Sequence, residues 1–146
     1  MRHCYFDIET TGLDPNKDKI LTFQYQELSQ VSGTPLTKLL IVKEWDYDYS
    51  ETKILEWLKT LLIDSPFWKF VPVGNNLVFD LSFIAARMRI YFHADFLMQL
   101  INRPFIDLKH VLVMINVNYV EMEAKAFLRT YGILKRNLPA IGGLIA

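Results

Sequence analysis

The chain has 146 residues, 51% of them hydrophobic and 22% charged, and its 16 Lys and Arg balance 16 Asp and Glu. This length predicts a single domain, 1–146, with enough apolar residues for a core. The zero net charge argues against a basic surface over the whole protein, and no apolar run approaches the roughly 20 residues of a membrane span.

The first predicted element is a strand at His3–Glu9 that brings two carboxylates together. Alternate side chains of a strand point to opposite faces, so Asp7 and Glu9 project from one face and Phe6 and Ile8 from the other. Neighbouring carboxylates repel each other, and Mg²⁺ or Mn²⁺, which prefer oxygen ligands, would offset that repulsion. The alternative interpretation is an edge strand whose acidic face is exposed to water.

Cys4, the only cysteine, lies in the same strand and is predicted to be buried. It cannot form an internal disulfide, which fits a reducing compartment. One cysteine and three histidines cannot build a structural zinc site. With no signal peptide evident, we expect a cytoplasmic, intracellular protein that does not associate with membranes.

The next segments predict an antiparallel meander followed by a helix. Thr10-Thr11-Gly12 predicts a sharp turn, and strands are expected at Ile20–Ser29 and Leu39–Trp45. A helix is predicted from Ser50, its N-cap, to Ser65-Pro66. Its apolar stripe consists of Ile54, Leu55, Leu58, Leu61 and Leu62.

The second half predicts alternating strands and helices. A central strand at Phe70–Gly74 is followed by a turn and a helix from Leu77 to about Tyr91, with Asn76 as a candidate cap. The elements expected after it are a strand at Pro104–Leu108, a helix or strand at Val111–Val120, and a helix at Ala124–Tyr131. Asp80 lies near the start of the Leu77 helix, where the helix dipole stabilises an acidic residue by about 0.3–1 kcal/mol.

Two segments resemble motifs of one family. Residues 6–13, with their Asp-Ile-Glu-Thr-Thr-Gly core, resemble the first motif of the DEDD superfamily of DnaQ-like 3′–5′ exonucleases. Residues 73–84 resemble the second motif, in which a strand, a polar turn and a helix present an Asp. The order of predicted elements also matches the ribonuclease-H-like fold of that family, an α/β fold with three antiparallel strands, then parallel strands, and flanking helices.

The resemblance implies a metal-dependent 3′–5′ exonuclease that removes nucleoside monophosphates from DNA or RNA with two Mg²⁺ or Mn²⁺ ions per site. It implies that the metal ligands are Asp7, Glu9 and Asp80. The residues it places around the nucleotides at a single-stranded 3′ end are Thr10, Thr11, Gly12, Leu13, Asn76 and Phe79. Five basic residues are candidate phosphate contacts: Lys109, Lys125, Arg129, Lys135 and Arg136.

The fourth motif of the family, an Asp preceded by His or Tyr on a late helix, is missing. The last Asp is Asp107, which resembles an accessory Asp of the family and equally fits a hydrogen-bonded strand end. Tyr119 and Glu123 imitate the tyrosine form of the motif but lie before its expected position. We therefore expect a domain truncated at its C-terminus.

Two alternative functions follow from this departure. One is a catalytically weak or inactive exonuclease-like domain that binds metal and single-stranded ends. The other is a different ribonuclease-H-like nuclease, such as an endonuclease, although the Thr-Thr-Gly turn argues against it. The sequence does not distinguish a DNA substrate from an RNA substrate. It also leaves open whether the protein forms a homodimer or binds a polymerase or repair partner.

Overall fold

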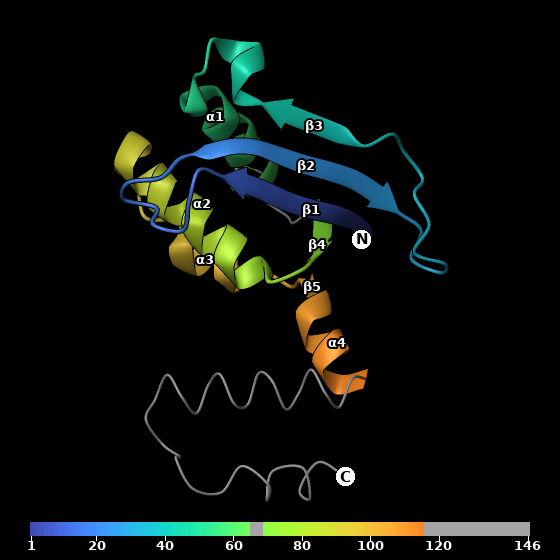
Figure 1. Cartoon of the computed structure of the whole chain (residues 1–146). Helices are drawn as coiled ribbons and strands as arrows, with labels where there is room; N and C mark the ends of the chain where they lie inside the picture. Colours follow the sequence, from blue (N-terminus) through green and yellow to red (C-terminus); the bar gives the residue numbers. More distant parts are fainter. Residues whose placement is uncertain (65–68, 116–146) are drawn as a thin grey trace, which may run out of the picture. The chain divides into compact units, whose positions relative to one another are not determined.

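The computed structural model describes residues 1–64 and 69–115, and the chain divides into two compact units at Asp107. The first unit comprises residues 1–107. In the second unit, the described residues form helix α4, Leu108–Ile115 (Figure 1). No helix within these described ranges is long and apolar enough to cross a bilayer. The predictions for 124–131 and for Tyr119 and Glu123 lie outside the described residues.

The first unit is built around a five-stranded mixed sheet, whose strands lie in the order β3-β2-β1-β4-β5 (Figure 1). The strands are β1 (Arg2–Thr10), β2 (Ile20–Leu28), β3 (Leu40–Lys43), β4 (Phe70–Gly74) and β5 (Ile106–Asp107). The pairs β1–β2 and β2–β3 are antiparallel, whereas β1–β4 and β4–β5 are parallel. The predicted mixed sheet is therefore confirmed. Because β1 is the middle strand, the edge-strand interpretation of its acidic face is wrong.

Helices α1 (Glu51–Leu62) and α2 (Leu77–Phe92) supply the apolar side chains that cover one face of the sheet. Cys4, Phe6 and Ile8 of β1 are buried in one cluster with Leu58 of α1 and Leu81 of α2. Burying each large apolar side chain contributes about 1.5–3 kcal/mol. The predicted apolar stripe of α1 is confirmed except at Leu61, which is only partly buried.

Several element boundaries differ from the predictions. The strand expected at Leu39–Trp45 ends at Lys43, because the chain turns into the 3₁₀ helix η1 (Glu44–Tyr47), whose Glu44 is buried in an ion pair with Lys19. The strand expected at Pro104–Leu108 is reduced to β5. The short helix α3 (Leu97–Ile101) was not predicted. Ser50 stands at the N-cap position of α1 but makes no side-chain cap hydrogen bond.

Gly74 allows β4 to end close against β1. A Cβ atom at this position would lie 2.5 Å from the Phe6 carbonyl oxygen, well inside van der Waals contact. A glycine therefore permits the close approach that sets the start of α2 beside the acidic end of β1.

Candidate active site

The alternation predicted for β1 is confirmed. Phe6 and Ile8 are buried in the core, whereas Asp7 is half-buried and Glu9 is exposed on the opposite face. On β2, Gln24 pairs with Asp7 and Thr22 pairs with Glu9. The two carboxylates therefore stand on the middle strand, next to its C-terminal end.

Asp80 lies in the first turn of α2 and is buried, with only 4% of its surface exposed. Its Oδ2 atom has no hydrogen-bond partner in the part of the chain that the structure describes. Burial, and then the charges of Asp7, Asp107 and Glu9, raise the pKa of Asp80 to about 8. At neutral pH this carboxyl therefore holds a proton unless a cation compensates its charge.

Tyr5 is a site residue that the sequence interpretation missed. Burial, and then the charge of Glu9, raise the pKa of Asp7, and the neighbouring Tyr5 side chain and Ile8 backbone oppose this rise. Burial and the nearby Asp7 also raise the pKa of Tyr5, so its hydroxyl stays protonated. The signal was the strand period itself, which places Tyr5, Asp7 and Glu9 on one face.

Asp107 caps helix α2 from the end of β5. Its Oδ1 accepts the Asn76 N–H at 2.8 Å, and its Oδ2 accepts the Leu77 N–H at 3.0 Å. The prediction that the Asn76 side chain caps this helix is wrong: Asn76 has a left-handed backbone (φ 59°) and makes no side-chain cap hydrogen bond. A carboxylate on the neighbouring parallel strand satisfies these amides instead, which holds the start of α2 and hence Asp80 in place.

The loop after β1 is closed by its own hydrogen bonds. Thr10 Oγ1 donates to the Gly12 carbonyl at 2.7 Å, and Thr11 Oγ1 donates to Asp18 Oδ1 at 3.1 Å. A Cβ atom on Gly12 would collide with Asp18 Oδ2, so the carboxylate occupies the space that a side chain would need. Leu13 is 81% exposed and presents an apolar side chain to solvent.

The other predicted substrate-binding residues lie at the start of α2. Asn76 is exposed, and Phe79 is half-buried with its ring 5.6 Å from that of Phe83. Lys109 lies in α4 of the second unit. The remaining predicted contacts, Glu123 and the four basic residues from Lys125 onward, lie outside the described residues.

The chemistry of these side chains fits a hard divalent cation, although they do not form a closed metal cage. Among the described residues, no three His, Cys, Asp or Glu side chains are gathered as a metal-binding group. Asp7 and Glu9 nevertheless lie near enough to Asp80 for their charges to raise its pKa. An all-oxygen donor set that includes an unpartnered buried oxygen suits Mg²⁺ or Mn²⁺.

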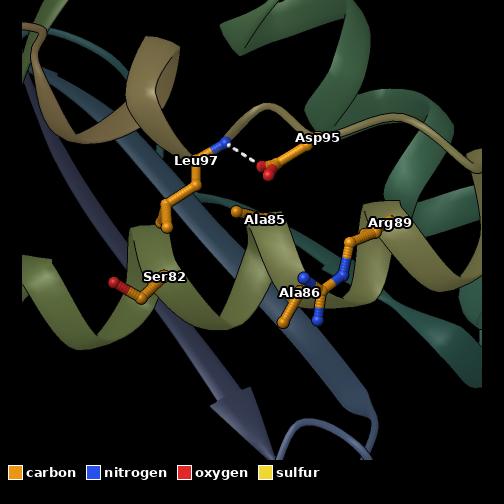
Figure 2. Close-up of a pocket in the computed structure, with 6 residues that line it drawn as sticks. All are labelled: Ser82, Ala85, Ala86, Arg89, Asp95 and Leu97. Atoms are coloured by element: carbon orange, nitrogen blue, oxygen red, sulfur yellow. Dashed lines mark hydrogen bonds between the residues drawn. The ribbon is translucent and has the colours of Figure 1, made fainter.

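A separate cavity of about 170 Å³ lies between α2 and the segment that leads into α3 (Figure 2). It is lined by Ser82, Ala85, Ala86, Arg89, Asp95 and Leu97. At about 100° of rotation per residue, Arg89 points to the opposite side of α2 from Asp80. None of the predicted site residues that the structure describes lines this cavity, so it is distinct from the carboxylates.

The comparison with protein families identifies the fold. The family model described as the RNase_H superfamily matches residues 4–143. The chain belongs to the RNase_H superfamily. This membership confirms the ribonuclease-H-like fold predicted from the order of elements. No curated protein matches the chain.

Solved structures of exonuclease I share the fold of this RNase_H superfamily chain. The chain is 14% identical to E. coli exonuclease I in complex with a dT13 oligonucleotide (TM-score 0.53), covering 73% of this chain and 28% of that one. It is 12% identical to the metal-free form of an E. coli ExoI–ssDNA complex (TM-score 0.53). That match covers 80% of this chain and 30% of the other chain. For SSB/Exonuclease I in complex with an inhibitor, the identity is 13% and the TM-score is 0.55. That match covers 77% of this chain and 29% of the other chain. The chain thus spans less than a third of these proteins, and the likeness concerns the fold alone.

Proposed function

We propose that this chain is a 3′–5′ exonuclease domain that removes nucleoside monophosphates from single-stranded DNA or RNA with Mg²⁺ or Mn²⁺, two ions per site. The observation that carries the proposal is the buried, unpartnered carboxyl of Asp80, which lies near enough to Asp7 and Glu9 for their charges to act on it. Asp7 and Glu9 come from the middle strand, and Asp80, buried with an unpartnered oxygen, comes from the first turn of α2. A buried, unpaired acid costs stability, so a functional role explains its presence.

The proposed mechanism assigns a role to each group. Asp7, Glu9 and Asp80 would hold the ions, which when bound supply an activated water and stabilise the leaving 3′ oxygen. Asp80 would give up its proton on binding an ion, since its raised pKa keeps it protonated otherwise. The Tyr5 side chain lies near Asp7 and would orient that carboxylate.

The residues around the carboxylates would bind the end of the substrate. The loop at Thr10, Thr11 and Gly12 is closed by its own hydrogen bonds and carries the exposed Leu13, which suits contact with the terminal nucleotide. Phe79 is half-buried, and stacking of an aromatic ring of this kind on a base contributes about 1–3 kcal/mol to the free energy of binding. The binding of single-stranded DNA by the structurally similar exonuclease I supports this substrate class.

A second candidate function is a domain that binds metal and single-stranded ends with little or no turnover. Asp107 is the last Asp of the chain, and its two oxygens cap α2, so it is already committed to a structural role. Under the first proposal, the fourth ligand comes from Glu123, from solvent or from another chain. We further propose that the protein is a single intracellular domain; a homodimer or a polymerase or repair partner stays a prediction.

The test is a gel assay with 5′-labelled single-stranded DNA and RNA, Mn²⁺ and the purified chain. We expect a ladder of 3′-shortened products that Asp7→Ala abolishes and that Asp46→Ala, which alters an exposed Asp, leaves intact. Mn²⁺-dependent binding without a ladder would favour the second function. A ladder that persists in Asp7→Ala would come from a contaminating nuclease and would contradict the proposal.

A further inference from the structure

A buried ion pair connects the loop after β1 to both core helices. Arg87 of α2 bonds Glu51, the first residue of α1, through Nε–Oε1 at 2.9 Å and Nη2–Oε2 at 2.6 Å. The side chains of Arg87 and Glu51 are only 10% and 2% exposed. The ring of Tyr91 lies 5.4 Å from the Arg87 guanidinium carbon. Such a pair is fully formed only when both helices are in place.

The remaining bonds of this pair go to the loop at residues 11–19. Arg87 Nη1 donates to the Pro15 carbonyl at 2.9 Å, and Glu51 Oε1 accepts the Ile20 N–H at 2.8 Å, where the loop ends and β2 begins. One side chain therefore holds the far side of the loop and the other holds its exit. At its entry, the Thr11 N–H donates to the Lys19 carbonyl at 3.0 Å.

The same helix face carries a carboxylate of the candidate active site. Arg87 follows Asp80 by seven residues, which is close to two full turns, so the two side chains leave α2 in nearly the same direction. The first turn of α2 thus places Asp80, and its third turn holds the loop that directly continues the strand of Asp7 and Glu9. The loop and the carboxylates share one rigid support.

We propose that Glu51 and Arg87 are positioning residues that hold the Thr10–Leu13 turn against the 3′-terminal nucleotide; this inference rests on the proposed function. The hydrogen bonds within the loop fix its shape but not its placement relative to Asp80. The bonds to Pro15 and Ile20 supply that placement. A substrate end held by this loop loses its alignment with the carboxylates when the loop is released, and misplacement by about 1 Å can cost about a hundredfold in rate.

The experiment compares the 146-residue chain with a neutral double variant, Glu51→Gln/Arg87→Met. This variant leaves no buried unpaired charge, and the glutamine amide retains an oxygen for the Ile20 N–H, so the fold is expected to persist. Arg87→Lys keeps the charge but cannot bond Glu51 and Pro15 with one planar fork. The matched control is Lys53→Met/Glu56→Gln, which removes an exposed ion pair from the same helix α1.

Two readouts separate positioning from general stabilisation. Hydrogen exchange at the bonded loop amides of Asp14, Asp18 and Lys19 reports the loop, and the amides of β1 report the core. In the double variant we expect at least tenfold faster loop exchange with unchanged β1 exchange, and at least tenfold lower kcat/KM on a single-stranded oligonucleotide. Arg87→Lys is expected to fall between wild type and the double variant, and the α1 control to match wild type.

The outcomes distinguish this inference from the proposed function. Unchanged loop exchange, or faster loop exchange with undiminished cleavage by an active protein, overturns the positioning role alone. If the wild type binds but does not cut, affinity for a 3′-ended oligonucleotide is measured instead, by fluorescence anisotropy with Mn²⁺. Weaker affinity of the double variant supports the positioning role, and equal affinity overturns it. A wild-type chain that neither binds nor shortens the oligonucleotide overturns both proposals.

Discussion

Asp80→Asn is expected to remove a pH-dependent loss of stability from the protein. In the folded chain the pKa of Asp80 is about 8, raised from an ordinary 3.8 by burial and then by the charges of Asp7, Asp107 and Glu9. The folded state therefore binds this proton more tightly than the unfolded state does. Without added metal, the contribution of Asp80 to stability is greatest below about pH 4 and is lost as the pH rises towards 8.

The size of the effect follows from that pKa. The interval from 3.8 to about 8, at about 1.4 kcal/mol per pH unit, gives at most about 6 kcal/mol. Water entry and local relaxation reduce the penalty of a buried charge, so we expect on the order of 2–4 kcal/mol. Asparagine has nearly the same shape as the carboxyl and does not ionise, so the variant avoids this loss.

The assay is urea unfolding in EDTA at pH 5 and pH 8.5. Because part of the loss occurs between pH 3.8 and pH 5, we expect wild type to lose roughly 1–2 kcal/mol more than Asp80→Asn between the two pH values. Asp46→Asn, at an exposed site, is the control and should behave as wild type. Identical pH dependence in wild type and Asp80→Asn would refute the argument. At pH 8.5, Mn²⁺ at a hundred times its Kd should restore about 2.7 kcal/mol to wild type and much less to the variant.

Two further substitutions test the supports of the site. Asp107→Ala removes both acceptors for the first amides of α2 and should lower the free energy of unfolding by about 1–3 kcal/mol in urea denaturation; Asp107→Asn, which keeps one acceptor, should lose about half as much. Gly74→Ala places a Cβ against the Phe6 carbonyl oxygen and should cost about 1–3 kcal/mol, visible as a lower Tm; an unchanged Tm would mean that β4 can move away from β1 without loss.

The parts of the site that the sequence predicts are those controlled by local periodicity. The two-residue repeat of a strand is enough to place Asp7 and Glu9 opposite the core, and a turn followed by an apolar helix is enough to place Asp80 in a first turn. The same reasoning includes Tyr5, whose influence on the pKa of Asp7 emerges only from the folded structure.

The rest depends on contacts between residues that are far apart in the chain. Asp107, 31 residues beyond Asn76, supplies the side-chain acceptors at the start of α2 that were expected of Asn76, because the parallel pairing of β5 with β4 brings it there. The bond between Glu51 and Arg87 spans 36 residues and joins two helices. The sequence pattern of one helix gives no information about its contacts with the other. Single-sequence periodicity contains no term for such pairs, since it describes one element at a time.

The position of β1 in the middle of the sheet also bears on how the molecule folds. Its partner β2 follows after a short loop, whereas its partner β4 pairs Arg2 with Phe70, which requires a long stretch of chain to close. Since short closures form sooner than long ones, we expect Asp7 and Glu9 to be aligned early and Asp80 to join them late. The repulsion among the carboxylates then arises mostly after the transition state. Replacing Asp80 should accordingly slow unfolding and leave the folding rate nearly unchanged.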